Sequence, residues 1–211
     1  MTETDGRKLR GNRTRASVLD AAVKLASVEG LEGLTLSRLA AQLEITKSGL
    51  FTHWRGKEGL QLAAMEYASE QWVTEIVAPA LAQPTPLQRL WALHANRLDF
   101  YERGQLPGRC FFSIVFREFD DRPGPIHDRL VIQSEQWHGF LVSMIEAAVA
   151  AGQLRPDIDA DLLAYEIDVL GEGVVSRVRM LDPKLVFGAA RAAVLQRLRA
   201  ASVDPSVLPD S

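Results

Sequence analysis

The stretch from Thr46 to His53 carries side chains that could contact a nucleic acid. Six of its positions are small or polar: Thr46, Lys47, Ser48, Gly49, Thr52 and His53. Hydroxyl, ammonium and imidazole groups can form hydrogen bonds with base edges and with phosphate oxygens. A short rigid helix with these groups on its outer face fits the DNA major groove, so the stretch predicts a DNA-contacting surface.

Apolar residues on both sides of this stretch would hold it in place. Those expected to face inward from two short helices and the turn between them are Leu36, Leu39, Ala40, Leu43, Ile45, Leu50, Phe51 and Trp54. Thr35 and Thr46 are suited to cap these helices. Together with the backbone at Lys57, they place helix N-termini where phosphates could bind. An ordinary helical hairpin is the alternative interpretation of the same pattern.

The charge distribution favours an anionic partner for the N-terminal part. Residues 1–57 hold 10 Lys and Arg against 6 Asp and Glu, a net charge of +4. Residues 58–211 hold 14 against 21, a net charge of −7. A solvated basic tail would give the same asymmetry. The negative net charge of residues 58–211 argues against a protein that coats DNA without sequence preference, because such a protein needs a basic surface throughout.

Several other classes of protein find no support in the sequence. The longest apolar runs are too short to cross a membrane, the polar N-terminus has no signal-peptide core, and the one cysteine, Cys110, excludes an internal disulfide. We therefore expect a cytoplasmic protein.

The sequence was also searched for the motifs of enzymes. The chain has no nucleotide-binding glycine motif and only one Glu-x-x-His pair, Glu135 and His138. We predict no catalytic residue, no metal and no cofactor, although a helical-bundle enzyme is the runner-up class.

Helix dominates the expected structure, and the fold class is all-α. Helices are predicted over residues 13–29, 35–43, 46–54, from Gly56 to near Pro79, and over 86–102, 126–151, 159–181 and 183–201. The apolar segment 108–119 could be a helix or a buried strand. The expected division is a DNA-binding domain over 1–57 with residues 1–12 flexible, a larger helical domain over 58–202, and a frayed tail over 203–211.

The segment from Leu34 to Leu60 resembles the DNA-binding signature of TetR-family transcriptional regulators. It follows the order of that signature, with a Thr-capped helix, a central Ala, an aliphatic turn, an aromatic helix and then Lys-Glu. Residues 108–130 are similar to a segment of one large subgroup. The resemblance implies three N-terminal helices that bind DNA, followed by helices that dimerise and enclose a small-molecule pocket.

The resemblance also implies roles for individual residues. Lys47, Ser48, Gly49, Thr52 and His53, with Thr46 and Phe51, fall on the recognition helix. Ser37 could reach DNA from the preceding helix, and Thr35 and Lys57 match phosphate-contact positions. Three positions depart from the signature: Glu44 replaces a turn Gly, Phe51 replaces a Tyr whose hydroxyl would meet phosphate, and Trp54 replaces a Phe.

The C-terminal part is predicted to dimerise and to bind a ligand. Apolar residues at helical spacing predict a dimer interface that includes Leu163, Leu170, Val174, Val178, Val194 and Leu198. Large side chains with a few polar ones predict a pocket lined by Met65, Trp72, His94, Phe111, Phe112, Trp137, His138, Met144 and Glu166. Ordinary core helices and a closed core are the alternatives.

Taken with the resemblance, these patterns predict a homodimeric repressor of an inverted-repeat DNA operator, released by a small-molecule effector and without a membrane partner. A transcriptional activator of the same fold is the alternative.

Overall fold

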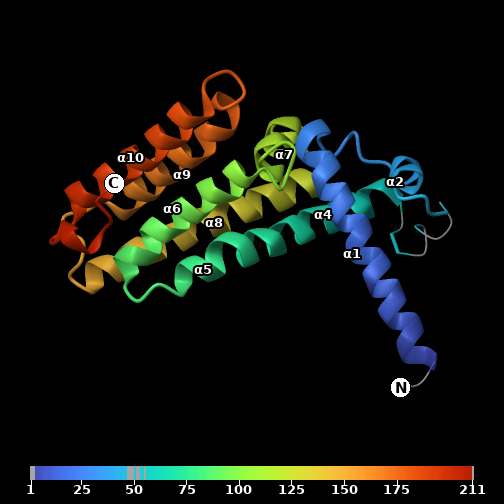
Figure 1. Ribbon diagram of the computed structural model, residues 1–211, viewed down its shortest axis with the longest axis horizontal. Coiled ribbons are helices and arrows are strands. Elements are labelled where there is room, and N and C mark those ends of the chain that lie inside the picture. The colour runs from blue at the N-terminus through green and yellow to red at the C-terminus, as the bar shows by residue number, and fades with distance from the viewer. Residues whose placement is uncertain (1–2, 47–49, 51–52, 55, 211) are drawn as a thin grey trace. The chain divides into compact units, whose positions relative to one another are not determined.

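Helices form the whole regular structure of the described part of the chain (Figure 1). The computed structural model describes residues 3–46, 50, 53–54 and 56–210, with side chains from Arg15 onward. The α-helices are α1 (Glu3–Glu29), α2 (Leu36–Gln42), α4 (Gly56–Trp72), α5 (Ala78–Leu81), α6 (Pro86–Arg103), α7 (Phe111–Phe119), α8 (Pro125–Ala150), α9 (Ala160–Arg177) and α10 (Pro183–Ala201). A π-helix, η1 (Val73–Val77), and a 3₁₀-helix, η2 (Pro205–Val207), complete them. The predicted all-α fold class is confirmed.

The chain forms two compact units. The first contains Met1–Gln71 and Leu106–Asp128, and the second contains Trp72–Gln105 and Arg129–Ser211. Residues 106–128, which include α7, thus share a unit with the N-terminal helices although they are far along the chain. The predicted functional boundary at residue 57 stays a prediction.

Three helices begin at residue types that favour a helix start. Thr35 caps α2, Asp182 caps α10 ahead of Pro183, and Pro86 opens α6. Gly30, after α1, takes the left-handed conformation with φ of 75°. The start of α1 differs, because helix extends back to Glu3 instead of beginning near residue 13.

The core of the first unit lies between α1 and α7. Val18, Ala22 and Ala26 of α1 are fully buried, and Phe111 and Val115 of α7 are buried too. The segment 108–119, ambiguous in sequence, is therefore helical from Phe111 onward, and its apolar face covers α1.

Gly108 lies so close to α1 that a larger residue would not fit. A Cβ atom at this position would lie 1.6 Å from the backbone oxygen of Ser27. The Gly108 N–H also donates to Ser27 Oγ at 3.1 Å. The chain that leads into α7 is thus fixed directly to the C-terminal part of α1.

In the second unit, α6 contacts α5, η1, α9 and α10. Its buried face carries Leu87, Leu90, Leu98 and Phe100. Figure 1 shows α9 and α10 running side by side, joined by a short connection, and they pack on each other.

The helical run expected to end near Pro79 ends at Leu81, two residues later, and it is not a regular α-helix throughout, because the chain passes through η1 into α5. Proline cannot donate the usual backbone hydrogen bond, and the π-turn immediately before it changes the pairing. Asn96 Nδ2 of α6 donates to the oxygen of Ile76 within this turn at 3.1 Å. The expectation of a frayed tail is wrong, because Leu208 is buried and η2 contacts α10.

Candidate nucleic-acid interface

Helix α2 begins at a Thr cap and presents polar residues outward. Thr35 is extended, with φ of −131° and ψ of 146°, and its hydroxyl accepts from the Arg38 N–H at 3.2 Å. Leu36 and Leu39 are buried, whereas Thr35 and Ser37 are exposed. Both predicted α2 contact residues therefore face solvent, as an interface with DNA requires.

The turn after α2 contains a strained residue. Glu44 has φ of 54°, in the left-handed region that the family signature fills with Gly. A side chain in this conformation costs roughly 1–2 kcal/mol. The backbone bond from Ile45 N to Ala40 O, at 3.0 Å, closes the turn. The strain is thus retained where the chain changes direction toward the predicted recognition helix.

The predicted recognition helix lies partly outside the described residues, which leave out Lys47, Ser48, Gly49, Phe51 and Thr52. At its ends, Thr46 is exposed and His53 is half-buried. Leu50 and Trp54 are buried, and the Trp54 N–H bonds back to Leu50 O at 3.3 Å. The described residues thus have apolar side chains inside and Thr46 outside, and Trp54 fills the core as predicted.

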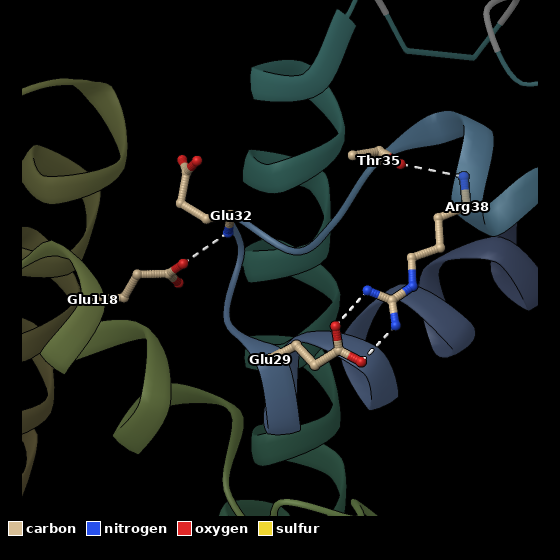
Figure 2. A network of polar contacts seen from close by, with 5 residues as sticks. All are labelled: Glu29, Glu32, Thr35, Arg38 and Glu118. Carbon is tan, nitrogen blue, oxygen red and sulfur yellow. Dashed lines mark hydrogen bonds and ion pairs between the residues drawn. The ribbon is translucent and has the colours of Figure 1, made fainter.

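Two basic residues near this surface are paired with carboxylates of the same unit. Arg38 donates through both terminal nitrogens to Glu29, as Figure 2 shows, and this hydrogen bonding raises the pKa of Arg38. Lys57 Nζ lies 2.9 Å from Glu32 Oε2. The end of α1 and the loop that follows it thus place acidic groups beside cations that could meet phosphate.

The same loop is held by α4 and α7. The Glu118 carboxylate of α7 accepts from the backbone N–H of Leu31 at 2.6 Å and of Glu32 at 2.8 Å. Gln61 Nε2 of α4 donates to Leu31 O at 2.8 Å. Sequence reasoning missed Glu118 and Gln61, because their partners lie 87 and 30 positions away and no local pattern marks them.

The predicted pocket residues are divided between the two units. Met65, Phe111 and Phe112 belong to the first unit, and Trp72, His94, Trp137, His138, Met144 and Glu166 belong to the second. Two of the polar ones contact other polar side chains: His138 Nε2 lies 3.1 Å from Asp161 Oδ1, and Glu166 forms an ion pair with Arg197. Their role in a pocket stays a prediction.

A cluster of aromatic rings and charged groups connects α6, α8 and α9 in the second unit. Arg97 is 7% exposed and donates to Tyr101 Oη at 2.9 Å and to Asp168 Oδ1 at 2.8 Å. Trp137 Nε1 donates to the same Asp168 oxygen at 2.9 Å. The Trp72 ring lies 5.6 Å from Trp137, edge to face, and Arg97 lies 5.5 Å from the Trp72 ring.

His94 is buried in the second unit, near Arg97 of this cluster. Its Nε2 is 3.1 Å from the oxygen of Ala190, and the side chain is almost fully buried. Burial, together with the charges of Arg97 and Arg191, lowers the pKa of His94 to about 3. The imidazole is therefore neutral at physiological pH and donates its Nε2 proton to Ala190.

Most of the predicted dimer residues face the interior of one subunit. Leu163, Val174, Val178, Val194 and Leu198 are buried, and only Leu170 among the six is exposed. The buried five lie where α9 packs on α10 and α6, and the part of all six residues in a dimer interface stays a prediction.

Comparison with known protein families decides what this arrangement belongs to. The profile of the "Bacterial regulatory proteins, tetR family" matches residues 18–64, and that of the "Tetracyclin repressor-like, C-terminal domain" matches residues 86–194, more than half of the chain. The chain belongs to the TetR family. It is therefore a DNA-binding transcriptional regulator, and the N-terminal match covers α2, its Thr cap and Lys57.

Individual TetR-family relatives cover most of the chain. The HTH-type transcriptional regulator SrpR of Pseudomonas putida is 27% identical over 148 residues, which make up 69% of this chain and 66% of SrpR, just under two thirds of that relative. A TetR transcriptional regulator from Chloroflexus aurantiacus J-10-FL is 28% identical, with a TM-score of 0.82 over 92% of this chain and 98% of its own.

A second solved TetR-family structure contains ligands. AibR in complex with isovaleryl coenzyme A and operator DNA is 20% identical, with a TM-score of 0.66 over 84% of this chain and 96% of its own. At this identity the likeness shows the shared fold. Within the described part of the chain, no helix has the length and apolar character needed to cross a membrane.

Proposed function

We propose that this TetR-family chain is a cytoplasmic homodimeric repressor that binds an inverted-repeat operator and leaves it when a small molecule binds the second unit. The observation that carries the DNA-binding part is the Thr35-capped α2, whose Leu36 and Leu39 are buried while Thr35 and Ser37 face solvent; Thr46, after the turn, is exposed as well. Predicted contacts from Lys47, Thr52 and His53 would then specify bases, while Thr35 and Lys57 would contact phosphate.

An experiment that selects bound sites from random DNA tests this proposal. One recognition helix covers only about 4–6 base pairs, so useful specificity needs two symmetric copies. We expect the selection to return an inverted repeat with a fixed spacing between half-sites. A single half-site, or no enriched sequence, would count against the proposed operator. An activator would return the same site, and placement of that site relative to a promoter separates the two roles.

Replacement of Thr35 should separate DNA contact from helix capping. Thr85 caps α6 with the same geometry, since its hydroxyl accepts from the Gln88 N–H at 3.3 Å. Thr35→Ala and Thr85→Ala should each lower the free energy of unfolding by about 1 kcal/mol. Thr35→Ala alone should weaken binding of operator and random duplexes alike, by about tenfold for one lost hydrogen bond to phosphate. Equal DNA affinities of the two variants would remove Thr35 from the interface.

The dimer proposal rests on apolar side chains that remain exposed beside the buried ones. On α9 these are Leu170 together with Leu162, Tyr165 and Val169, and the last three are spaced by three and four residues so that they share one helix face. Leu185 of α10 is also exposed. Such exposed apolar side chains on adjoining helices suit contact with a second copy.

A charge on this exposed α9 face should disrupt the dimer without unfolding the subunit. We expect Val169→Glu to give a monomer in sedimentation at micromolar concentration, with helical content unchanged. Val194→Glu should unfold the subunit instead, because that residue is fully buried. A Val169→Glu protein that stays dimeric would place the interface elsewhere.

The effector proposal is supported by the aromatic and charged cluster around Arg97 and by the AibR complex, which shows that a protein of this fold binds isovaleryl coenzyme A and DNA. A ligand can release DNA only if it prefers the dimer whose recognition helices are spaced badly for the operator. A tenfold loss of DNA affinity needs about 1.4 kcal/mol of such preference. Compounds that raise the melting temperature should therefore also lower operator affinity.

A further inference from the structure

Lys57, a predicted phosphate contact, already has a carboxylate partner in its own subunit. Its ammonium lies 2.9 Å from Glu32 Oε2, and the two side chains are 39% and 54% exposed. A pair so exposed contributes little to stability, so Lys57 can exchange its partner at small cost. A phosphate that binds Lys57 must nevertheless replace Glu32 or lie close beside it.

The backbone that carries Glu32 is fixed from two sides. Glu118 of α7 accepts from the N–H groups of Leu31 and Glu32, and Figure 2 shows its carboxylate directed at the Glu32 nitrogen. Gln61 lies one helical turn after Lys57 on α4 and donates to Leu31 O. Because the same face of α4 holds the loop and carries Lys57, the Glu32 carboxylate is held within reach of that ammonium.

The neighbouring pair of Arg38 and Glu29 has a different geometry. Each terminal nitrogen of Arg38 donates to one carboxylate oxygen of Glu29, and this pair of bonds joins α2 to the end of α1. Such a two-bond contact fixes the position of a helix. The Lys57 pair has one contact on a flexible side chain, which suits exchange rather than anchoring.

We propose that Glu32 is an internal counter-charge that competes with DNA phosphate for Lys57 and so lowers the general DNA affinity of the regulator. The proposal rests on the proposed phosphate contact of Lys57. When Lys57 moves to a phosphate, the freed Glu32 carboxylate must take up a cation from solution. Compared with a protein that lacks the Glu32 carboxylate, DNA binding then releases one cation fewer overall. Every DNA sequence is therefore bound more weakly, by a similar factor. Glu32 thereby tunes affinity, while base contacts determine sequence preference.

The test removes the Glu32 charge and keeps its shape. With a selected operator and a shuffled duplex of equal length at about 0.1 M salt, Glu32→Gln should bind both about two- to fivefold more tightly. The plot of log affinity against log salt concentration should become steeper by up to about 0.9. A merely structural role for Glu32 predicts weaker binding and no steeper salt dependence.

The matched control is Glu75→Gln. Glu75 forms an exposed pair with Arg103 at 3.1 Å in the second unit. Glu75→Gln therefore changes the net charge of the chain as much as Glu32→Gln does, but leaves the first unit unchanged. Its DNA affinity should equal that of the unchanged protein. Equal gains for Glu75→Gln and Glu32→Gln would overturn the proposal, because net charge would then explain both.

A double-mutant cycle with Lys57→Ala shows whether Glu32 acts through Lys57. In the Lys57→Ala background, Glu32→Gln should no longer tighten binding. A gain that persists without Lys57 would overturn the proposal, since Glu32 would then repel DNA directly. An unchanged affinity of Glu32→Gln on an operator that the parent protein binds would also overturn it. If the proposed function is wrong, the selection experiment returns no inverted repeat. The affinity of Glu32→Gln for the shuffled duplex still tests the role of Glu32 in that case, so the two failures can be distinguished.

Discussion

Asp168→Ala should lower the free energy of unfolding by about 3 kcal/mol in chemical denaturation at pH 7. Removal of one partner from a buried ion pair costs about 3–5 kcal/mol, because the remaining charge stays out of water without compensation. Arg97 is 7% exposed, but the Asp168 side chain is 33% exposed, which favours the lower end of that range. The change also removes the acceptor of Trp137 Nε1.

Glu102→Ala is the control for this prediction. Glu102 pairs with Arg191 at 3.1 Å on the surface, so its loss should cost no more than about 1 kcal/mol. Arg97→Leu combined with Asp168→Leu should recover part of the stability, since an apolar pair leaves no buried charge. Equal losses for Asp168→Ala and Glu102→Ala would show that water reaches the Arg97 guanidinium.

His94 should make the protein less stable in mild acid. Its pKa is lowered to about 3 in the folded chain, chiefly by burial, against about 6.5 when unfolded. Between these two values the unfolded chain binds a proton that the folded chain does not. Stability from this residue is therefore complete above pH 6.5 and is lost as the pH falls toward 3. The loss should reach about 2 kcal/mol at pH 5.

His94→Gln tests this dependence, because a glutamine amide can still donate to the oxygen of Ala190 but does not titrate. The difference in unfolding free energy between the parent and the variant should change by about 2 kcal/mol from pH 8 to pH 5. His138→Gln, at an exposed contact with Asp161, is the comparison variant, because it makes the same exchange of residue types while the buried His94 imidazole stays in place. Parallel profiles of the parent and His94→Gln would contradict the prediction.

The neutral state of His94 in the folded chain also limits which ligands can bind near it. Because His94 is neutral in the folded chain, a ligand that reached it would meet an imidazole and not a cation. The charged groups near it are Arg97 and Arg191, and both have carboxylate partners, Asp168 and Asp99. An anionic effector bound in this region would therefore have to displace a carboxylate.

The sequence determined the features that depend on near neighbours. Thr35 and Asp182 cap helices because a short polar side chain reaches an N–H two or three residues away. Glu44 stands where the family's turn has Gly, and the structure gives it the left-handed conformation with φ of 54°. The outward position of Thr35 and Ser37 follows from helical period.

Contacts between distant segments were decided by the tertiary structure. Glu118 bonds Leu31 across 87 positions, and Arg97 bonds Asp168 across 71, so neither pair has a local sequence signature. α10 has apolar residues on several sides, so periodicity left open which of them face inward. Packing against α9 and α6 buries Val194 and Leu198 in the subunit. A helix pattern specifies which side chains share a face, but only the neighbouring helices determine which face they cover.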